Sequence, residues 1–123
     1  MKVLLVNGSP HKNGCTHRAL QEIQMQLKKE AIDSEIFWIG STVQGCIGCC
    51  QCQESGTCVF DDILKIFLEK AKDTDGFVFG SAVYYGSSTG SLSSFMDRLI
   101  LKTNQLPQLF PVAEEVLLKP SPR

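Results

Sequence analysis

The sequence predicts an α/β domain built on a parallel sheet, and three observations support this prediction. Short apolar runs alternate with amphipathic stretches of helical length, as in strands that are joined by crossover helices. The 123 residues are 43% hydrophobic and 20% charged, which suits one globular domain with a buried core. Polar loops that contain glycine follow the first and third apolar runs, at the edge of a parallel sheet where ligands bind.

The first half of the chain contains two predicted strands and one predicted helix. Residues 2–6 form a short apolar run that ends at turn residues, as a buried parallel strand does. Residues 16–32 place apolar side chains on one face and polar ones opposite, which predicts an amphipathic helix. Residues 34–39 are rich in strand-forming side chains. Residues 40–60 hold four glycines and five cysteines, so we expect a long, irregular, functional loop there.

The second half repeats the alternation once more. Asp61 and Asp62 are placed to cap a helix that carries apolar residues at helical spacing up to residue 71. Residues 76–80 open a third strand, which we expect to run on toward residue 83. Residues 92–100 then indicate a third helix. Right-handed crossovers between these elements give a parallel sheet, and a strand order of 2-1-3 would place the first and third loops together.

The end of the chain differs in composition from the rest. Residues 104–123 contain four of the five prolines and one short apolar stretch that two glutamates interrupt. We therefore expect an α/β domain over residues 1–103 and an irregular tail over residues 104–123.

Charge and hydropathy exclude several classes of partner. The net charge is −1 and the isoelectric point is about 6.1, so the chain lacks the basic field that nucleic acid or an anionic membrane requires. The apolar run at the N-terminus is too short for a secretory signal, and no other stretch approaches the length of a membrane span. We expect a cytoplasmic protein.

The loop after the first strand has the features of a phosphate site. Residues 7–16 lead from a strand into a helix, whose free N–H groups and macrodipole attract an anion. Ser9 and Thr16 supply hydroxyl groups, and Gly8 and Gly14 let the backbone approach a ligand closely. The loop matches neither the dinucleotide pattern GxGxxG nor the P-loop. The alternative interpretation is a polar connection in which Thr16 caps the helix.

Cysteine is the unusual residue of this sequence, because five of the six lie within thirteen positions. Four of them form the spacing C-x2-C-x2-C-x5-C: Cys46, Cys49, Cys52 and Cys58. Compact spacing of this kind suits an iron–sulfur centre or an all-thiolate zinc site, and free thiols are the remaining alternative. Cys50 is left over, and Cys15 is interpreted as a packing residue.

The loop after the third strand offers a surface for a planar ligand. Tyr84 and Tyr85 provide flat apolar faces, and Gly86 and the following hydroxyl side chains provide hydrogen-bonding groups. In the alternative interpretation the tyrosines belong to the core and Ser91 caps the next helix.

With these loops placed, the chain resembles the flavodoxin-like NAD(P)H-dependent FMN reductase family, and most of all its iron–sulfur flavoprotein branch. Three ordered segments carry the resemblance: VNGSPHKNGCT at 6–16, GCIGCCQCQESGTCVFDD at 45–62 and GFVFGSAVYYGSSTGSLSSFMDR at 76–98. The match extends from residue 1 to about residue 101. It implies a three-layer flavodoxin-like parallel sheet of order 2-1-3 in a C-terminally short relative that lacks the last two strands.

The resemblance also implies the cofactors and their ligands. The first loop would wrap the FMN phosphate, with Ser9, His11, Asn13, Gly14, Cys15 and Thr16. The third loop would line the isoalloxazine ring, with Val83, Tyr84, Tyr85, Gly86 and Ser87. In the iron–sulfur branch the loop with Cys46, Cys49, Cys52 and Cys58 holds a 4Fe-4S cluster. No catalytic side chain is assigned, because the flavin carries the chemistry.

The expected function is therefore an FMN-binding oxidoreductase that passes electrons from NAD(P)H through the flavin to a small-molecule acceptor such as a quinone or free flavin. A homodimer is expected because an open sheet edge needs a cover. Two alternatives stay open: an electron carrier without its own substrate, and a four-cysteine metal-binding domain or inactive remnant of the fold.

Overall fold

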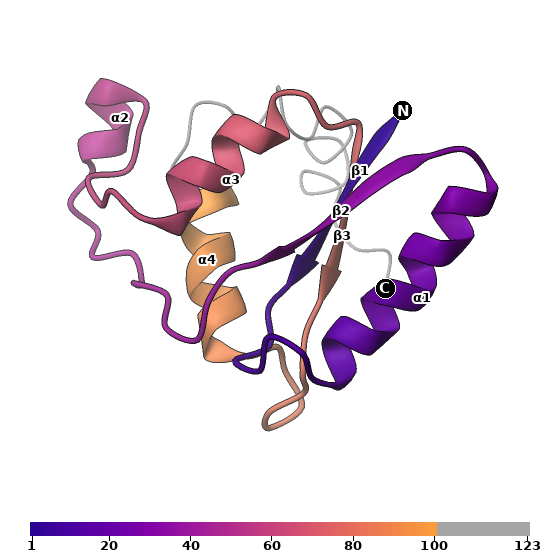
Figure 1. The fold of residues 1–123 in the computed structure, drawn as a ribbon. Coiled ribbons are helices and arrows are strands. Elements are labelled where there is room, and N and C mark those ends of the chain that lie inside the picture. The colour runs from indigo at the N-terminus through magenta and orange to yellow at the C-terminus, as the bar shows by residue number, and fades with distance from the viewer. Residues whose placement is uncertain (101–123) are drawn as a thin grey trace, which may run out of the picture.

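A parallel sheet of three strands forms the centre of the computed structural model, which describes residues 1–100 (Figure 1). The strands are β1 (Lys2–Asn7), β2 (Asp33–Trp38) and β3 (Gly76–Gly80). Their order is β2-β1-β3, and β1 pairs in parallel with both neighbours. The predicted order is thus confirmed. The boundary expected at residue 103 and the tail over 104–123 lie outside the described residues.

Helices cover both faces of the sheet and complete three layers. Figure 1 shows α1 (Cys15–Lys29) on one face and α3 (Ile63–Ala71) with α4 (Gly90–Ile100) on the other. The single-turn helix α2 (Gln51–Ser55) lies within residues 40–60, the cysteine loop, and away from the sheet. Within residues 1–100, no helix has the length and apolar character that crossing a membrane requires.

The central strand is buried on both sides, which explains its uninterrupted apolar run. Leu4 and Val6 belong to the core beneath α3 and α4, together with the fully buried Phe67. Val3 and Leu5 face the opposite way and pack with Leu20 of α1.

The first helix ends earlier than its sequence pattern predicts. Its last turn closes with two hydrogen bonds, from Ile32 N to Leu27 O at 2.9 Å and from Ala31 N to Lys28 O at 3.1 Å. This is the Schellman arrangement, with Ala31 in the left-handed conformation at φ 57°. Glycine is the usual residue at this position, so an alanine gave no signal that the helix stops.

Two further boundaries differ from prediction, and one cap is confirmed. β3 ends at Gly80 and does not continue toward residue 83. The loop expected to be irregular contains α2, which is flanked by Cys50 at the N-cap and Gly56 at the C-cap, both in left-handed conformation. Asp62 caps α3 as predicted, because its Oδ1 accepts a hydrogen bond from Leu64 N at 3.3 Å.

Substituting Gly8 is expected to destabilise the protein, because the backbone is crowded there. A Cβ atom at Gly8 would lie 2.8 Å from Leu92 Cβ and 3.1 Å from Gly80 O. We expect Gly8→Ala to lower the free energy of unfolding by about 1–3 kcal/mol, the usual cost of overpacking. Gly90→Ala is the matched control: a Cβ there meets no atom within 4 Å. Alanine at that first helical position should be neutral or slightly stabilising. Equal urea midpoints for the two variants would contradict the prediction.

Candidate cofactor site and cysteine loop

The first and third loops meet at the carboxyl edge of the sheet, since β1 and β3 are parallel neighbours (Figure 1). Gly8 N donates a hydrogen bond to Gly80 O at 2.8 Å, and Thr89 Oγ1 donates to Gly8 O at 2.6 Å. The Thr89 hydroxyl also accepts from Leu92 N at 3.1 Å, in the first turn of α4. Thr89 therefore caps α4 and holds the two loops together, and the interpretation of Ser91 as the cap is wrong.

The first loop is held in shape by its own polar groups. Asn7 is fully buried; its Oδ1 accepts from Ser9 N at 3.0 Å and its Nδ2 donates to Lys12 O at 3.2 Å. Ser9 Oγ accepts from His11 N at 3.2 Å. Trp38 at the end of β2 donates its Nε1 hydrogen to Ser9 O at 2.9 Å. Hydrogen bonds within the protein thus fix the shape of the loop.

The N-terminus of α1 is open toward this loop. The helix begins at Cys15, and Gly14 at the N-cap position supplies no side-chain hydrogen bond. The first turn carries no acidic residue, so its amides are free of a side-chain cap and favour an anion. Thr16 is the second residue of the helix, and the interpretation of Thr16 as the cap is wrong. Cys15 is exposed, so its interpretation as a packing residue is also wrong.

The predicted phosphate-loop residues are therefore brought together at one end of α1. Ser9 is buried, Gly14 and Thr16 are half-buried, and the other three are exposed: His11, Asn13 and Cys15. Positive charge is present as well, with Lys12 Nζ 5.6 Å from the centre of the Trp38 ring.

The third loop turns tightly and presents apolar side chains to solvent. Tyr84 N donates to Ser87 O at 3.0 Å and Ser87 N to Tyr84 O at 3.1 Å. Between them Tyr85 and Gly86 have φ of 52° and 72°, the pattern of a type I′ turn. Tyr85 is fully exposed and Tyr84 is 51% exposed, so the interpretation of the tyrosines as core residues is wrong. Val83 is exposed beside them.

A tyrosine in left-handed conformation is an unfavourable local choice. The conformation costs a residue with a Cβ atom about 1–2 kcal/mol, and here it holds a large apolar ring in water. Strain of this kind is common where a loop is shaped for a ligand.

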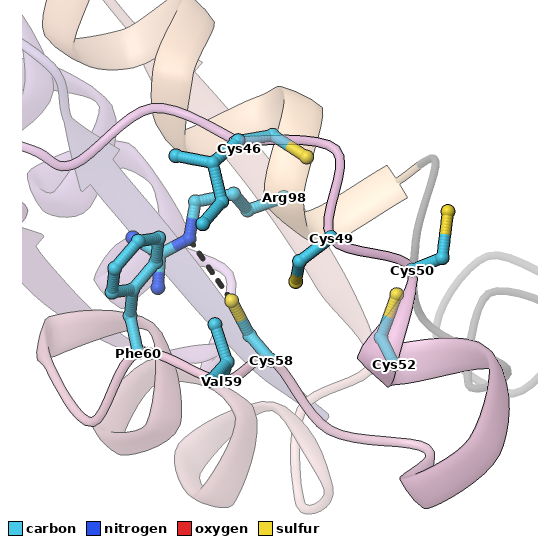
Figure 2. A pocket seen from close by; sticks show the side chains of 9 residues that line it. Cys46, Cys49, Cys50, Cys52, Cys58, Val59, Phe60 and Arg98 are labelled. Atoms are coloured by element: carbon cyan, nitrogen blue, oxygen red, sulfur yellow. Dashed lines mark hydrogen bonds between the residues drawn. The ribbon is translucent and has the colours of Figure 1, made fainter.

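The four spaced cysteines line one pocket, together with apolar residues and Arg98 (Figure 2). Cys52 on α2 is buried and Cys58 is half-buried, whereas Cys46 and Cys49 are exposed. Cys50 lines the same pocket, but Figure 2 shows its side chain pointing away from the other four, and its Sγ lies 3.5 Å from Gly48 O. Its role as the spare thiol stays a prediction.

The four spaced cysteine thiols have the chemistry of a metal–thiolate centre, although they do not converge on one point. All six cysteines are free, and five of them line the pocket: the four spaced cysteines and Cys50. In the part of the chain that the structure describes, no three histidine, cysteine or acidic side chains lie close enough to hold one metal ion. Four thiolates are the ligand set of a 4Fe-4S cluster or of structural zinc, so the chemistry of the residues fits either group.

Arg98 is the residue of this site that the sequence analysis missed. It projects from α4, is 1% exposed, and pairs with Asp62 through two hydrogen bonds of 2.7 and 2.8 Å. Its Nη1 also donates to Gln44 O at 3.0 Å, and its Nε donates to Cys58 Sγ at 3.4 Å. These Arg98 hydrogen bonds hold the pKa of Asp62 below its ordinary value. A lone arginine among the apolar positions of the predicted helix was the available signal.

The protein is a three-layer α/β domain with the strand order β2-β1-β3, and the N-terminus of α1 and the tyrosine turn lie at the carboxyl edge of its sheet. These features define a flavodoxin-like protein. The sequence profile described as NADPH-dependent FMN reductase matches residues 1–111. The chain therefore belongs to the NADPH-dependent FMN reductase family, in its iron–sulfur flavoprotein branch. The predicted resemblance is confirmed.

Relatives of this branch support the assignment. An iron–sulfur flavoprotein of Methanocaldococcus jannaschii is 37% identical over 100 residues, which cover 80% of this chain and 51% of the relative. An iron–sulfur flavoprotein of Archaeoglobus fulgidus is 35% identical over 99 residues, which cover 80% of this chain and 48% of the relative. This chain thus spans about half the length of the curated relatives it matches.

A solved structure shows the same fold. The crystal structure of RosB with a bound 8-demethyl-8-formylriboflavin-5′-phosphate intermediate superposes with a TM-score of 0.64 at 17% sequence identity. The superposition covers 80% of this chain and 42% of that one. The predicted fold class, a flavodoxin-like parallel sheet, is confirmed.

Proposed function

We propose that the chain binds FMN across its first and third loops and acts as an NAD(P)H-dependent oxidoreductase. The observation that carries the proposal is that the open N-terminus of α1 and the exposed tyrosine turn belong to two loops that meet at the same carboxyl edge of the sheet. The two features differ in chemistry as the two ends of FMN do: one suits a phosphate and the other suits a planar ring. Family membership supports the same cofactor.

In this proposal the protein binds the cofactor and orients it. When bound, FMN supplies hydride acceptance from NAD(P)H and electron transfer to a small-molecule acceptor. The first-turn amides of α1 and the side chains of Ser9 and Thr16 would hold the phosphate, and Asn7 keeps that loop in shape. Tyr84 and Tyr85, which are exposed on the third loop, would orient the ring. We propose that the chain works in the cytoplasm as a homodimer, whose mass light scattering would measure.

We further propose that Cys46, Cys49, Cys52 and Cys58 hold a 4Fe-4S cluster. Two observations support this: the four thiols share one pocket, and the relatives are named iron–sulfur flavoproteins. A cluster held there supplies one-electron transfer.

The visible absorption spectrum of the 123-residue chain, purified anaerobically and offered FMN, is the first test. Two flavin bands, and turnover of NAD(P)H with free flavin or a quinone, are expected. Bound flavin without turnover would favour the electron carrier. A broad brown shoulder with iron and acid-labile sulfide would support the cluster, whereas zinc alone would support the metal-binding domain. A protein that ignores FMN would overturn the proposal.

Tyr85→Asn is expected to weaken FMN binding without loss of stability. Asparagine tolerates the left-handed conformation at this position, so the free energy of unfolding should stay equal or rise. The lost ring surface should raise the Kd for FMN about tenfold, which corresponds to about 1.4 kcal/mol. Tyr85→Phe keeps the ring and should bind as the unaltered protein does. Equal affinity of both variants in a fluorescence titration would remove Tyr85 from the site.

A further inference from the structure

Arg98 is a fully buried cation whose guanidinium donates its hydrogen bonds to residues in and next to the cysteine loop. Its guanidinium is 1% exposed, which is costly for a charge unless partners compensate it. Each hydrogen bond that the structure gives to the guanidinium goes to Gln44, Cys58 or Asp62, none of which belongs to α4. The side chain therefore connects a sheet-packed helix to a loop 36 to 54 residues earlier in the sequence.

These partners lie on both limbs of the loop. Gln44 precedes the first cysteine of the four, and Cys58 is the last of them. Asp62 fixes the outgoing limb where α3 begins, and the Phe60 ring lies 5.1 Å from the guanidinium carbon. One side chain thus ties the two ends of the segment 45–57 to the same point. Bringing the ends of a loop together costs chain entropy. The hydrogen bonds of Arg98 offset this cost without the help of a metal.

The same side chain places a positive charge against one thiol. Arg98 Nε lies 3.4 Å from Cys58 Sγ, and Figure 2 shows this hydrogen bond inside the pocket. A set of four thiolates carries excess negative charge, which a neighbouring cation offsets most strongly in a buried setting. Hydrogen bonds to sulfur and local charge are among the factors that set the reduction potential of an iron–sulfur cluster.

We propose that Arg98 is the positioning residue of the cysteine site: it clamps both limbs of the loop to α4 and sets a hydrogen-bonded positive charge at Cys58 Sγ. The charge part of this inference rests on the proposed cluster, whereas the clamp is a property of the chain alone. The two parts therefore call for separate measurements on the same set of proteins.

The proteins are the unaltered chain, Arg98→Gln, Arg98→Lys and the control Glu35→Gln. Arg98→Gln removes both the charge and the planar set of guanidinium N–H donors. Arg98→Lys keeps the charge but not this set of donors. Glu35→Gln breaks an ion pair with Lys70, of 2.7 Å, that joins β2 to α3 away from the loop. It reports the effect of losing an ion pair elsewhere.

The first measurement is limited proteolysis of the metal-free proteins, with cuts located by mass spectrometry. We expect cleavage within residues 45–57 to become at least about tenfold faster in both Arg98 variants, since the loop ends are released. Glu35→Gln should be cleaved at the rate of the unaltered chain. Unchanged cleavage in Arg98→Lys overturns the clamp, and this variant decides the question if circular dichroism shows that Arg98→Gln does not fold.

The second measurement is reconstitution with ferrous iron and sulfide, followed by the iron content and midpoint potential. Reduction adds an electron, so losing the cation should shift the potential of Arg98→Gln downward, and Arg98→Lys should recover part of the shift. A fold defect alone would lower the iron content without this recovery by lysine. If the unaltered chain takes up no iron, both the proposed cluster and the charge role are overturned. The proteolysis measurement still tests the clamp in that case. Equal potentials in all four proteins overturn the charge role alone.

Discussion

Thr16→Asp is expected to abolish FMN binding. Thr16 is the second residue of α1, in the first turn, where the helix amides have no side-chain cap. A carboxylate at this point would face the FMN phosphate at close range, and two like charges at such a distance repel by several kcal/mol in a partly buried setting. We expect the Kd for FMN to rise at least about 100-fold, which corresponds to about 3 kcal/mol.

The control for this change is Thr16→Asn, which has nearly the same shape without the charge. The carboxylate should not unfold the protein, because an acidic side chain in the first turn of a helix stabilises it by about 0.3–1 kcal/mol. Loss of binding together with equal or higher stability would therefore be an effect on the ligand. Fluorescence titration with FMN measures the affinity. If Thr16→Asp and Thr16→Asn bind equally well, the phosphate does not lie at this helix.

The parallel sheet and its covering helices could be predicted because their signals are local. The uninterrupted apolar run of β1 and the helical spacing of α1, α3 and α4 are properties of short stretches. The misses were local as well. The left-handed residue that follows the end of α1 is Ala31 and not the usual glycine, and α2 has five residues, fewer than periodicity can detect.

The loops of the site were predictable, but the side chains that hold them were not. Thr89 meets Gly8 across 81 sequence positions, and Arg98 meets Gln44 across 54. Neither contact follows from spacing, because each depends on how α4 sits against the sheet. The same holds for the tyrosines: their exposure is decided by the turn at Tyr85, where a non-glycine residue with positive φ is not expected.

Asp62→Ala is expected to cause the largest loss of stability. The substitution leaves the buried guanidinium of Arg98 without its carboxylate, and it removes the cap of α3. Breaking a buried pair costs about 3–5 kcal/mol, less here because the Asp62 side chain is 30% exposed. The cap adds about 1 kcal/mol, so we expect a total near 4 kcal/mol in urea denaturation. Asp62→Asn keeps a capping oxygen and should lose about 3 kcal/mol; a loss below 1 kcal/mol for both would show that the pair contributes little.

Acid provides an independent test of the same pair, since it removes the charge without mutation. The hydrogen bonds from Arg98 lower the pKa of Asp62 in the folded state, whereas the unfolded value is about 4. A depressed folded-state pKa gives stability that is present in full above about pH 5 and is lost as the pH falls through the folded value. Asp62 in turn raises the pKa of Arg98, so the guanidinium keeps its charge over this range. The stability difference between the unaltered chain and Asp62→Asn should therefore stay constant from pH 7 to about pH 5 and shrink below about pH 4. A difference that is unchanged at pH 3 would mean that the carboxylate charge of Asp62 does not contribute to the stability of the folded protein.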